Sequence, residues 1–229
     1  MPLWKLVLVS FIQISIAASI WGGLLFHGAG DWYWQRGFVH LGLWLVTFAI
    51  NLAFLLLRGR EVLEARLKRA KITQRWDKLI MFLMVPAMLA IPYVGGLDGA
   101  KVITSSVSDL VPLFIAILFQ TLGDAIVVWT MLVNPFLEKG VRIQKERGHK
   151  VITTGPYAYV RHPMYLGMFF MFLAIPPVLG SRLAYVPVLL VIILLTIRTH
   201  FEDGLLFNEL AGYDEYAKNT RYRLFPGIW

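Results

Sequence analysis

Long apolar segments constrain this chain more than any other feature of its sequence. A helix that crosses a membrane needs roughly 20 apolar residues, because it has to cover about 30 Å of hydrocarbon. Four segments approach or exceed that length, and they are Leu6–Phe26, Phe38–Leu57, Leu79–Val94 and Leu110–Val133. Backbone groups inside a bilayer must be hydrogen-bonded within the protein, which favours helices. We therefore expect an all-α fold, a polytopic bundle of transmembrane helices.

A fifth apolar segment, Met164–Ile197, is long enough for two crossings. It contains Pro176-Pro177 and, shortly after, Gly180-Ser181. Proline removes a helix donor and clashes with the preceding turn, so we expect a helical hairpin broken at these two pairs. The chain then has six spans, or five if the last pair is short or re-entrant.

Composition favours a single membrane-embedded domain over residues 1–229. Hydrophobic residues make up 58% of the chain and the mean hydropathy is +0.64, above the roughly 45–50% apolar content of soluble domains. Four spans fall in residues 1–133, and the last hairpin and the tail fall in residues 134–229. The first segment exceeds the roughly 7–15 residues of a signal-peptide core, so we interpret it as a retained span. The absence of cysteine excludes disulfides, thiolate nucleophiles and cysteine-based metal sites.

The formal net charge of +8 comes from basic residues in the loops next to the apolar segments. Such residues anchor a protein to anionic lipid headgroups, so we expect the bilayer rather than a nucleic acid as partner. Basic residues crowd the loop 58–78, the connection 139–161 and the tail 218–223, whereas the alternate loops carry only Arg36, Lys101 and Arg182. The positive-inside rule then predicts a multi-pass membrane protein with both termini in the cytoplasm.

Several polar residues interrupt the apolar pattern. Arg60–Ala70 resembles a short amphipathic surface helix, with Val62, Leu63 and Leu67 expected to face lipid. Three amides within the spans should hydrogen-bond between helices, and they are Gln13, Asn51 and Gln120. Asp124 is a functional candidate because an acid inside a span is costly, although pairing with a basic residue of a neighbouring helix would also explain it.

The most varied polar stretch is Glu146–Tyr165, which lies between two apolar segments. Asn134-Pro135 ends the span before it, and the alternation of apolar and charged residues after that point predicts a structured loop. Taken singly, its tyrosines fit an interfacial aromatic belt, and Arg161 fits a side chain reaching for lipid phosphates. Together its groups predict a site: His149, Gly155-Pro156-Tyr157, Tyr159, Arg161-His162-Pro163 and Tyr165.

A second polar cluster, Arg198 with Glu202 and Asp203, follows the next apolar segment. Arg198 and Glu202 are four residues apart on a helix, so they share a face and can pair. One arginine beside two acids suits a ligand of mixed charge. The histidines and acids show no metal-ligand spacing such as H-E-x-x-H, so no metal is expected, and there is no P-loop or G-x-G-x-x-G.

These motifs resemble the isoprenylcysteine carboxyl methyltransferase family, which belongs with the membrane phospholipid methyltransferases. The resemblance runs from Asn134 onward. It lies in Gly148-His149, Gly155-Pro156-Tyr157, Val160-Arg161-His162-Pro163-x-Tyr165, Arg198-x-x-x-Glu202-Asp203, Gly212-Tyr213-x-x-Tyr216 and Arg221-Tyr222-Arg223-Leu224-x-Pro226. The first four spans match only in general hydropathy and in the basic loop that ends with Trp76-Asp77-Lys78.

The resemblance implies a methyltransferase that uses S-adenosyl-L-methionine, releases S-adenosyl-L-homocysteine and binds both in a cytoplasm-facing pocket of the C-terminal half. By the resemblance Arg198 would face the acceptor, Glu202 the cofactor, and Arg161 would orient either one. The implied cofactor-binding residues are Gln144, His149, Lys150, Val151, Ile152, Tyr157, His162, Pro163, Met164, Tyr165, Glu202 and Asp203. Two features depart from the family. A second glutamate is usual where this chain has Asp203, and Gln144 lies closer to His149 than in the eukaryotic enzymes.

The chemistry agrees with this prediction. Methyl transfer from a sulfonium is an in-line displacement, so alignment and exclusion of water are the protein's main tasks. The rings of Tyr157 and Tyr165 can attract the sulfonium by cation–π interaction. A carboxylate or thiolate acceptor needs no base, whereas an amine or phenol would need one, with Glu202, Asp203 or His162 as candidates.

Two other functions remain open at this point. A membrane sterol or steroid reductase has a similar C-terminal architecture but uses NADPH. A non-catalytic lipid-binding or transport protein could also keep the fold, although paired broken helices, typical of transporters, are not visible. The lipophilic acceptor itself could be an isoprenylcysteine carboxylate, a phospholipid amine, a quinol, a small thiol or an isoprenoid lipid.

Overall fold

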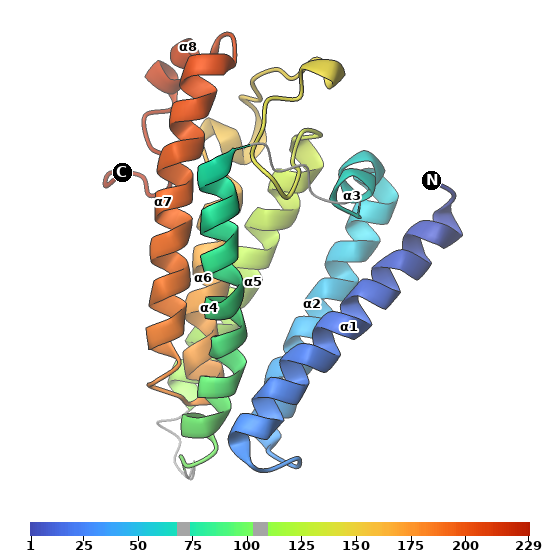
Figure 1. Ribbon diagram of the computed structural model, residues 1–229, viewed down its shortest axis with the longest axis vertical. Coiled ribbons are helices and arrows are strands. Elements are labelled where there is room, and N and C mark those ends of the chain that lie inside the picture. The colour runs from blue at the N-terminus through green and yellow to red at the C-terminus, as the bar shows by residue number, and fades with distance from the viewer. Residues whose placement is uncertain (68–73, 103–109) are drawn as a thin grey trace.

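The computed structural model describes residues 1–67, 74–102 and 110–229, and within those ranges all regular structure is helical (Figure 1). The long helices run side by side, and they are α1 (Leu3–Ala29), α2 (Gln35–Arg58), α4 (Arg75–Gly99), α5 (Leu110–Val133), α6 (Pro163–Leu179) and α7 (Tyr185–Glu209). In the described part of the chain, four short helices lie near one end, namely α3 (Arg60–Leu67), α8 (Tyr213–Asn219) and the 3-10 turns η2 (Lys145–Arg147) and η3 (Gly155–Ala158). The predicted all-α bundle is confirmed.

Five of these helices are long and apolar enough to cross a membrane, and α6 is a shorter apolar helix beside them. This agrees with the predicted five to six spans, and α5 has the predicted bounds. The helix α4 is longer than the predicted Leu79–Val94. The helix begins at Arg75, before its apolar part, and its first turn holds Asp77, which has no exposed surface.

The last two long helices form the predicted hairpin, but its turn begins only at Gly180, after the proline pair. Pro176 and Pro177 lie inside the last turn of α6, and the helix ends at Gly180, whose φ of +69° favours glycine. The carbonyls of the two prolines still accept hydrogen bonds from Ser181 and Gly180, so the proline pair does not break the helix. Asp98 of α4 then accepts hydrogen bonds at the start of the next helix, including 3.0 Å from the Ser181 hydroxyl.

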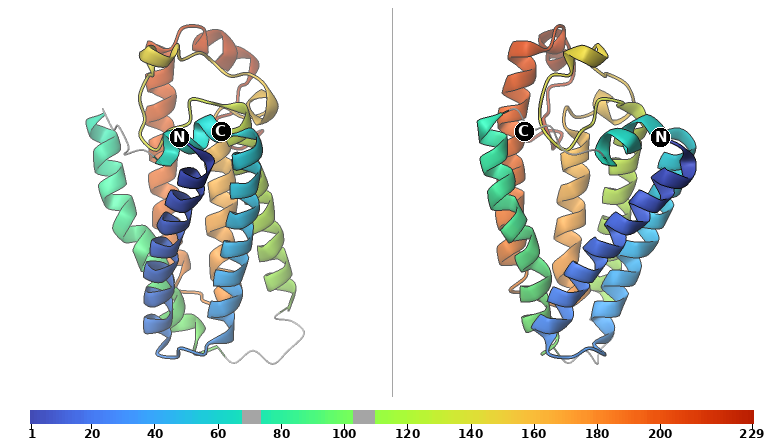
Figure 2. Two further views of the ribbon diagram at one scale, coloured as in Figure 1. Left: turned by 90° about the vertical axis from the view of Figure 1, so that its right-hand side faces the viewer. Right: turned by 45° about the vertical axis from the view of Figure 1, so that its right-hand side comes forward.

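The helices form two groups that meet at one end and diverge at the other (Figure 1, Figure 2). The helices α4 to α7 make one group, and α1, α2 and α3 make the other. The main apolar core lies among α4, α6 and α7 and includes Leu25 and Phe26 from the end of α1. At the closed end α1 approaches α4 so closely that a Cβ on Gly96 would lie 2.1 Å from the carbonyl oxygen of Leu25. The end where the groups diverge carries the short helices and the C-terminal tail.

The short helix α3 faces the protein rather than lipid, contrary to the prediction for Val62 and Leu63. Both side chains are buried and pack against Leu6, Leu55 and Met131, while Leu67 contacts the same cluster. The amphipathic pattern shows that one face is apolar, but here the ends of α1, α2 and α5 cover that face. Of the predicted Arg60–Ala70, residues 68–70 lie outside the described part.

The polar residues within the spans are placed in two ways. The amides of Asn51 and Gln120 donate to the Asp124 carboxylate over 3.3 and 2.8 Å. Asn51 therefore joins α2 to α5 as predicted, while Gln120 bonds within its own helix. No basic side chain forms an ion pair with Asp124 in the ranges described. Gln13 is exposed on α1 rather than placed between helices.

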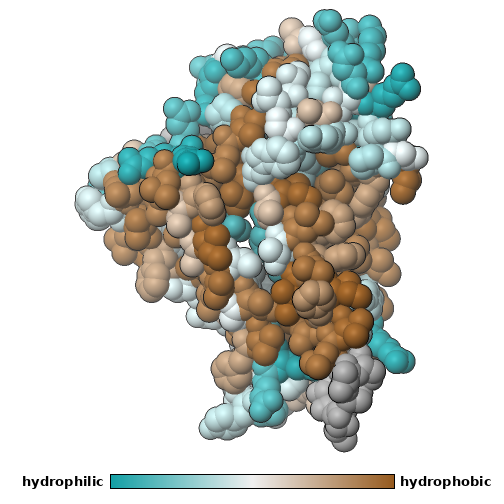
Figure 3. Space-filling model, turned by 180° about the vertical axis from the view of Figure 1, so that it is seen from behind, coloured by the Kyte–Doolittle hydropathy of each residue, from teal (hydrophilic) through white to brown (hydrophobic). Residues whose placement is uncertain are grey.

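The surface of the molecule shows the same division. On the face shown in Figure 3, a broad apolar band covers the middle of the helices, and hydrophilic residues lie toward both ends. Many large apolar side chains of the helices are exposed, such as Phe82, Phe114 and Val186 at 60–75%. An integral membrane protein accounts for such a band, because lipid tails cover it.

Candidate functional site

The connection between α5 and α6 folds over the polar end of the bundle as a structured loop. Asn134 ends α5 and holds both sides of the loop, since its amide nitrogen donates to the hydroxyl of Tyr157 over 2.7 Å. Its side-chain oxygen accepts from the backbone of Phe136 at 2.9 Å. Gly155 opens η3 with a φ of +62°, and a Cβ there would lie 2.9 Å from the Val133 side chain. Local hydrogen bonds and one left-handed glycine therefore place Tyr157 over the bundle.

Gln144 and His149 stabilise the first half of this loop. Gln144 is 2% exposed, its amide nitrogen donates to the carbonyl of Phe136, and its oxygen accepts from Arg147 at 2.6 Å. The His149 ring packs against the ring of Phe136 with 4.6 Å between centroids. Burial lowers the pKa of His149, and the charges of Arg142 and Arg147 lower it further, so the imidazole is neutral near pH 7. The Gln144 amide is thus engaged at both ends within the loop.

Asp203 forms the centre of a buried charge cluster. Arg161 donates to both of its carboxylate oxygens, from Nε and Nη2 at 2.9 Å each. His162 Nε2 lies 3.1 Å away, and Tyr213 and Arg223 each donate over 2.7 Å. The Asp203 side chain has no exposed surface. Because a buried carboxylate needs several donors to offset its lost hydration, these groups form one unit.

This cluster joins the Arg161-His162-Pro163 motif to the C-terminal tail. The backbone N–H groups of Arg161 and His162 donate to the carbonyls of Tyr222 and Arg223, each over 2.9 Å. Arg161 also donates from Nη1 to the carbonyl of Thr220. Burial alone would lower the pKa of Arg161, but the Asp203 carboxylate outweighs that effect and raises it. Arg161 is therefore a cation held in place by the tail and by α7.

Arg198 pairs with Asp77 of α4 rather than with Glu202, contrary to the expected contact along α7. Its Nε lies 2.9 Å from Asp77 Oδ1, and both side chains are buried. Its Nη2 donates to the carbonyl of Lys139 over 2.7 Å. Asp77 is available at the same buried level from α4, so Arg198 turns across the bundle and ties α7 to α4 and to the loop.

Glu202 is left facing the interior with a neutral partner. Its carboxylate accepts a hydrogen bond from the hydroxyl of Tyr165. The other acid on this side, Glu138, pairs with Arg142 at 2.9 Å. No Lys or Arg forms an ion pair with Glu202 within the described residues.

These groups surround a polar cavity at the end of the bundle where the two groups of helices diverge. It contains about 820 Å³ of space between atoms, its open mouth included. Every residue predicted above as catalytic or cofactor-binding lines it except Asp203, namely Gln144, His149, Lys150, Val151, Ile152, Tyr157, Arg161, His162, Pro163, Met164, Tyr165, Arg198 and Glu202. Of the wider predicted cluster, Gly155, Pro156 and the exposed Tyr159 lie outside the lining. Asp203 lies behind the wall, where it holds Arg161 and His162 in place. The structure thus brings the predicted residues together, while their roles remain predictions.

Other residues of the cavity wall were missed by the sequence analysis as site residues. Tyr213 and Tyr216 of α8 line it, and the Tyr216 hydroxyl donates to the carbonyl of Tyr157 over 2.7 Å. Burial raises the pKa of both α8 tyrosines, so they are neutral phenols near pH 7. Their spacing in the tail motif was a signal for them. Asn134 and Phe136 also line the cavity, but no sequence motif indicated them, because the folded loop brings them there.

A second cavity lies among the long helices. It contains about 1030 Å³ of space between atoms, its openings included, and its lining is mostly apolar, from α1, α2, α4, α5 and α6. Its polar groups are His40, which accepts from the Trp21 indole over 3.1 Å, and Gln120. Met164 of α6 lines the polar cavity and Met168, one turn further along, lines the apolar one. One helix therefore borders both cavities.

Comparisons with known proteins find a family match for residues 113–208. No curated protein matches the chain. A solved structure of the eukaryotic intramembrane Ras methyltransferase ICMT, without a monobody, is similar at 21% sequence identity and a TM-score of 0.48, over 99% of this chain and 98% of that one. Residues 113–208 match the model of the isoprenylcysteine carboxyl methyltransferase (ICMT) family. The resemblance predicted from the motifs is thus confirmed by the match over residues 113–208, and this match supports a methyltransferase.

Proposed function

We propose that this protein is a membrane methyltransferase that takes its methyl group from S-adenosyl-L-methionine and transfers it to a lipophilic acceptor. The whole chain acts as one domain, with residues 134–229 as its catalytic region. The polar cavity binds the donor and faces the cytoplasm, as do both termini. The acceptor enters from the bilayer between the helices.

The polar cavity suits this donor in its chemistry. When bound, the donor supplies an electrophilic methyl group on a sulfonium. Glu202 offers a carboxylate without a cationic partner among the described residues, and the rings of Tyr157 and Tyr165 offer negative π faces. A cationic ligand is therefore attracted to this wall.

Each residue of the wall has a part in alignment and in the exclusion of water. Glu202 and Tyr165 orient the donor through a shared hydrogen bond. Arg161, held by Asp203, positions the Arg161-His162-Pro163 turn, and Arg198, held by Asp77, presents its guanidinium on the acceptor side. The loop with Tyr157 covers the cavity from above. Positioning of this kind is the main contribution that a protein makes to an in-line displacement.

The apolar cavity supports a lipophilic acceptor. Aromatic, methionine and aliphatic side chains line most of it, so it favours a hydrocarbon chain. Met164 and Met168 border the two cavities one helical turn apart, which is about 5.4 Å along α6. A chain held in the apolar cavity can therefore place its polar end at the donor. Both an isoprenylcysteine carboxylate and a phospholipid fit this arrangement.

The observation that carries the proposal is the Glu202 carboxylate in the wall of the polar cavity, and calorimetric titration of detergent-purified protein tests it. We expect S-adenosyl-L-homocysteine to bind saturably and NADPH not to bind. Glu202→Ala should weaken binding by about tenfold or more, because a hydrogen bond to a charged group contributes about 1.5–3 kcal/mol. Glu209→Ala, on the exposed end of the same helix, is the matched control. Binding of NADPH instead, or equal affinity in the Glu202 variant, would contradict the proposal.

A further inference from the structure

The apolar cavity among the long helices contains a polar side chain that the proposed function leaves unexplained. His40 of α2 lines this cavity and is 7% exposed. The rest of the described lining is apolar or aromatic apart from Gln120, whose amide nitrogen already donates to Asp124 over 2.8 Å. A hydrocarbon chain makes no use of an imidazole. Polar side chains inside a membrane are costly, so His40 is a candidate for ligand binding.

The hydrogen bond between Trp21 and His40 determines which imidazole nitrogen carries the proton. The indole Nε1 of Trp21 lies 3.1 Å from His40 Nε2. An indole N–H can only donate a hydrogen bond, so His40 Nε2 is the acceptor and carries no proton. A neutral imidazole of this kind carries its proton on Nδ1. His40 is therefore a hydrogen-bond donor at Nδ1.

The Nδ1 donor faces the cavity and has no protein partner there. Within residues 1–67, 74–102 and 110–229, the contact with Trp21 is the one hydrogen bond of the His40 ring. Ser10 Oγ is the only side-chain polar atom in those ranges that is both fully buried and unpartnered, so Nδ1 keeps some accessible surface. Because His40 is otherwise enclosed, that surface lies in the cavity. An N–H group in apolar surroundings is unfavourable until an acceptor atom reaches it.

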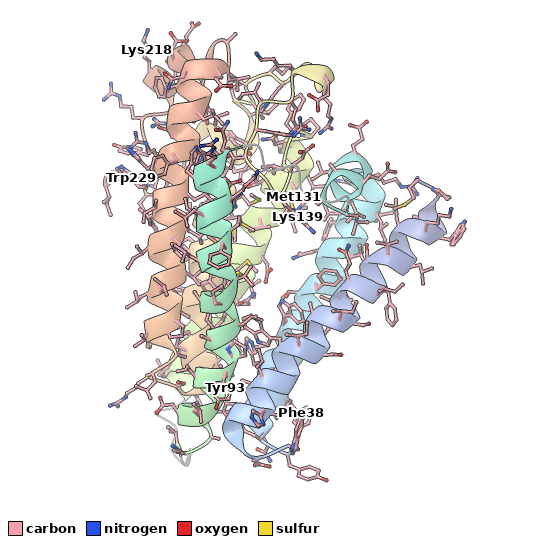
Figure 4. All side chains as sticks on the ribbon, viewed as in Figure 1. Phe38, Tyr93, Met131, Lys139, Lys218 and Trp229 are labelled. Carbon is pink, nitrogen blue, oxygen red and sulfur yellow. The ribbon has the colours of Figure 1, made fainter. Side chains whose placement is uncertain are left out.

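His40 lies toward the closed end of the bundle, away from the donor. Phe38, two positions earlier on α2, marks that end in Figure 4. Leu43, three positions after His40 and on the same face of the helix, packs against a cluster that includes Ala174 of α6. Ala174 follows Met164, which lines the polar cavity, by ten residues. His40 is therefore about 15 Å or more from the polar cavity along α6.

We propose that His40 Nδ1 donates to an oxygen atom in the apolar body of the acceptor, a carbonyl or a hydroxyl, while the other end of the acceptor lies at the donor. This inference rests on the proposed function and deepens it. It names the acceptor class as a lipid with a second polar group about 15 Å or more from its methylated end. An unsubstituted isoprenoid or acyl chain leaves Nδ1 without a partner and fits this cavity less well. Trp21 acts through His40 as a positioning residue, because its indole sets the tautomer.

The test is a positional scan with octadecanoic acid and its monoketo derivatives, titrated calorimetrically into protein in phosphatidylcholine nanodiscs. The carbonyl moves along the chain by one carbon at a time, so the keto probes differ only in its position. We expect one position, or two adjacent ones in the distal half of the chain, to bind about threefold to tenfold more tightly than plain octadecanoic acid, as a neutral hydrogen bond implies. Equal affinity at every position would overturn the site, because water rather than a ligand oxygen would then satisfy Nδ1.

Three substitutions of His40 separate its donor from the bulk of its ring. His40→Phe keeps an aromatic ring, so it should lose the keto preference and still bind plain octadecanoic acid at least as tightly. His40→Asn should keep the preference, because its amide nitrogen lies two bonds beyond Cβ, as Nδ1 does. His40→Gln should lose it, because its nitrogen lies one bond further, as Nε2 does. Survival of the preference in His40→Phe, or its loss in His40→Asn, would contradict the assignment to Nδ1.

His27→Phe is the matched control, since His27 is an exposed histidine in the last turn of α1 and should leave the scan unchanged. Titration of the same preparations with S-adenosyl-L-homocysteine tests the proposed function separately. The His40 variants should bind it as tightly as the wild type, which also shows that they are folded. A wild type that keeps the keto preference without binding S-adenosyl-L-homocysteine would count against the methyltransferase alone. Binding of S-adenosyl-L-homocysteine without a preferred keto position would count against His40 alone.

Discussion

Two adjacent acids show how the site is divided at the level of single residues. Successive residues of a helix point about 100° apart, so Glu202 and Asp203 face different surroundings. Glu202 faces the polar cavity and accepts from Tyr165. Asp203 faces away from it and binds Arg161, His162, Tyr213 and Arg223. The first is placed for ligand binding and the second for holding the tail against the loop.

Asp203→Asn should therefore destabilise the protein far more than Glu202→Gln. Removing one partner of a buried ion pair typically costs about 3–5 kcal/mol, because it leaves an uncompensated charge. The Asp203 variant leaves Arg161 and Arg223 without their shared carboxylate, whereas Glu202→Gln should change stability by less than about 1 kcal/mol, since its side chain keeps a polar partner. Denaturant unfolding in detergent, followed by far-UV circular dichroism, measures both. Equal losses in the two variants would argue against the division.

The residues of the site were predictable where the sequence carries a dense motif. The stretch from His149 to Tyr165 combines rings, cations and turn residues, and both of its ends line the polar cavity together with Tyr157, whereas Tyr159 is exposed. The partner of Arg198 was not predictable, because Asp77 lies 121 positions away and a closer acid, Glu202, fits the helical spacing. Helical spacing says which residues share a face, but the choice between two acids is made by the packing of α4 against α7.

At the scale of the elements, α5 and α6 pack closely against each other through two glycines. A Cβ on Gly123 would lie 2.6 Å from the carbonyl oxygen of Gly167, and a Cβ on Gly167 would lie 2.7 Å from that of Gly123. Small residues at such a crossing let membrane helices approach closely. This contact sets the position of α6, which borders both cavities.

Gly123→Ala should destabilise the bundle by about 1–3 kcal/mol, because the added methyl group meets backbone rather than a movable side chain. Gly23→Ala in α1 is the matched control, since nothing lies within 4 Å of its added Cβ. There the better helix propensity of alanine should give a small gain of about 0.4–1 kcal/mol. Thermal unfolding of both variants in the same detergent makes the comparison. A neutral Gly123→Ala would show that the two helices can separate without cost.

The elements themselves were largely predictable from hydropathy, and their surroundings were not. The bounds of α5 and the hairpin of α6 and α7 follow from apolar length and from the glycine turn. The orientation of α3 was wrong in the prediction, because an apolar stripe fits lipid and protein equally well. The burial of α3 depends on Leu6, near the start of α1, and Met131, near the end of α5, which are distant from α3 in sequence.

At the scale of the whole molecule, the basic loops and the polar cavity lie at the same end. The polar cavity, the loop over it and the tail all lie at one end, with the basic loops around them (Figure 1). The opposite end holds the turns after α1 and α6. A water-soluble donor and a lipid-soluble acceptor need this asymmetry, because each must reach the reaction from a different phase. The proposed function thus requires that the end with the cavity face the cytoplasm.

The absence of cysteine makes that orientation measurable with single introduced thiols. Lys218→Cys places one on α8 at the cavity end (Figure 4), and Tyr33→Cys places one at the other end, where Tyr33 is 87% exposed. The positive-inside rule predicts that a membrane-impermeant maleimide labels only Tyr33→Cys in intact cells, and that Lys218→Cys reacts only once the membrane is opened. The wild type, which has no thiol, is the control. Labelling of Lys218→Cys from outside would reverse the orientation and separate the cavity from a cytoplasmic donor, so the proposed function would fail with it.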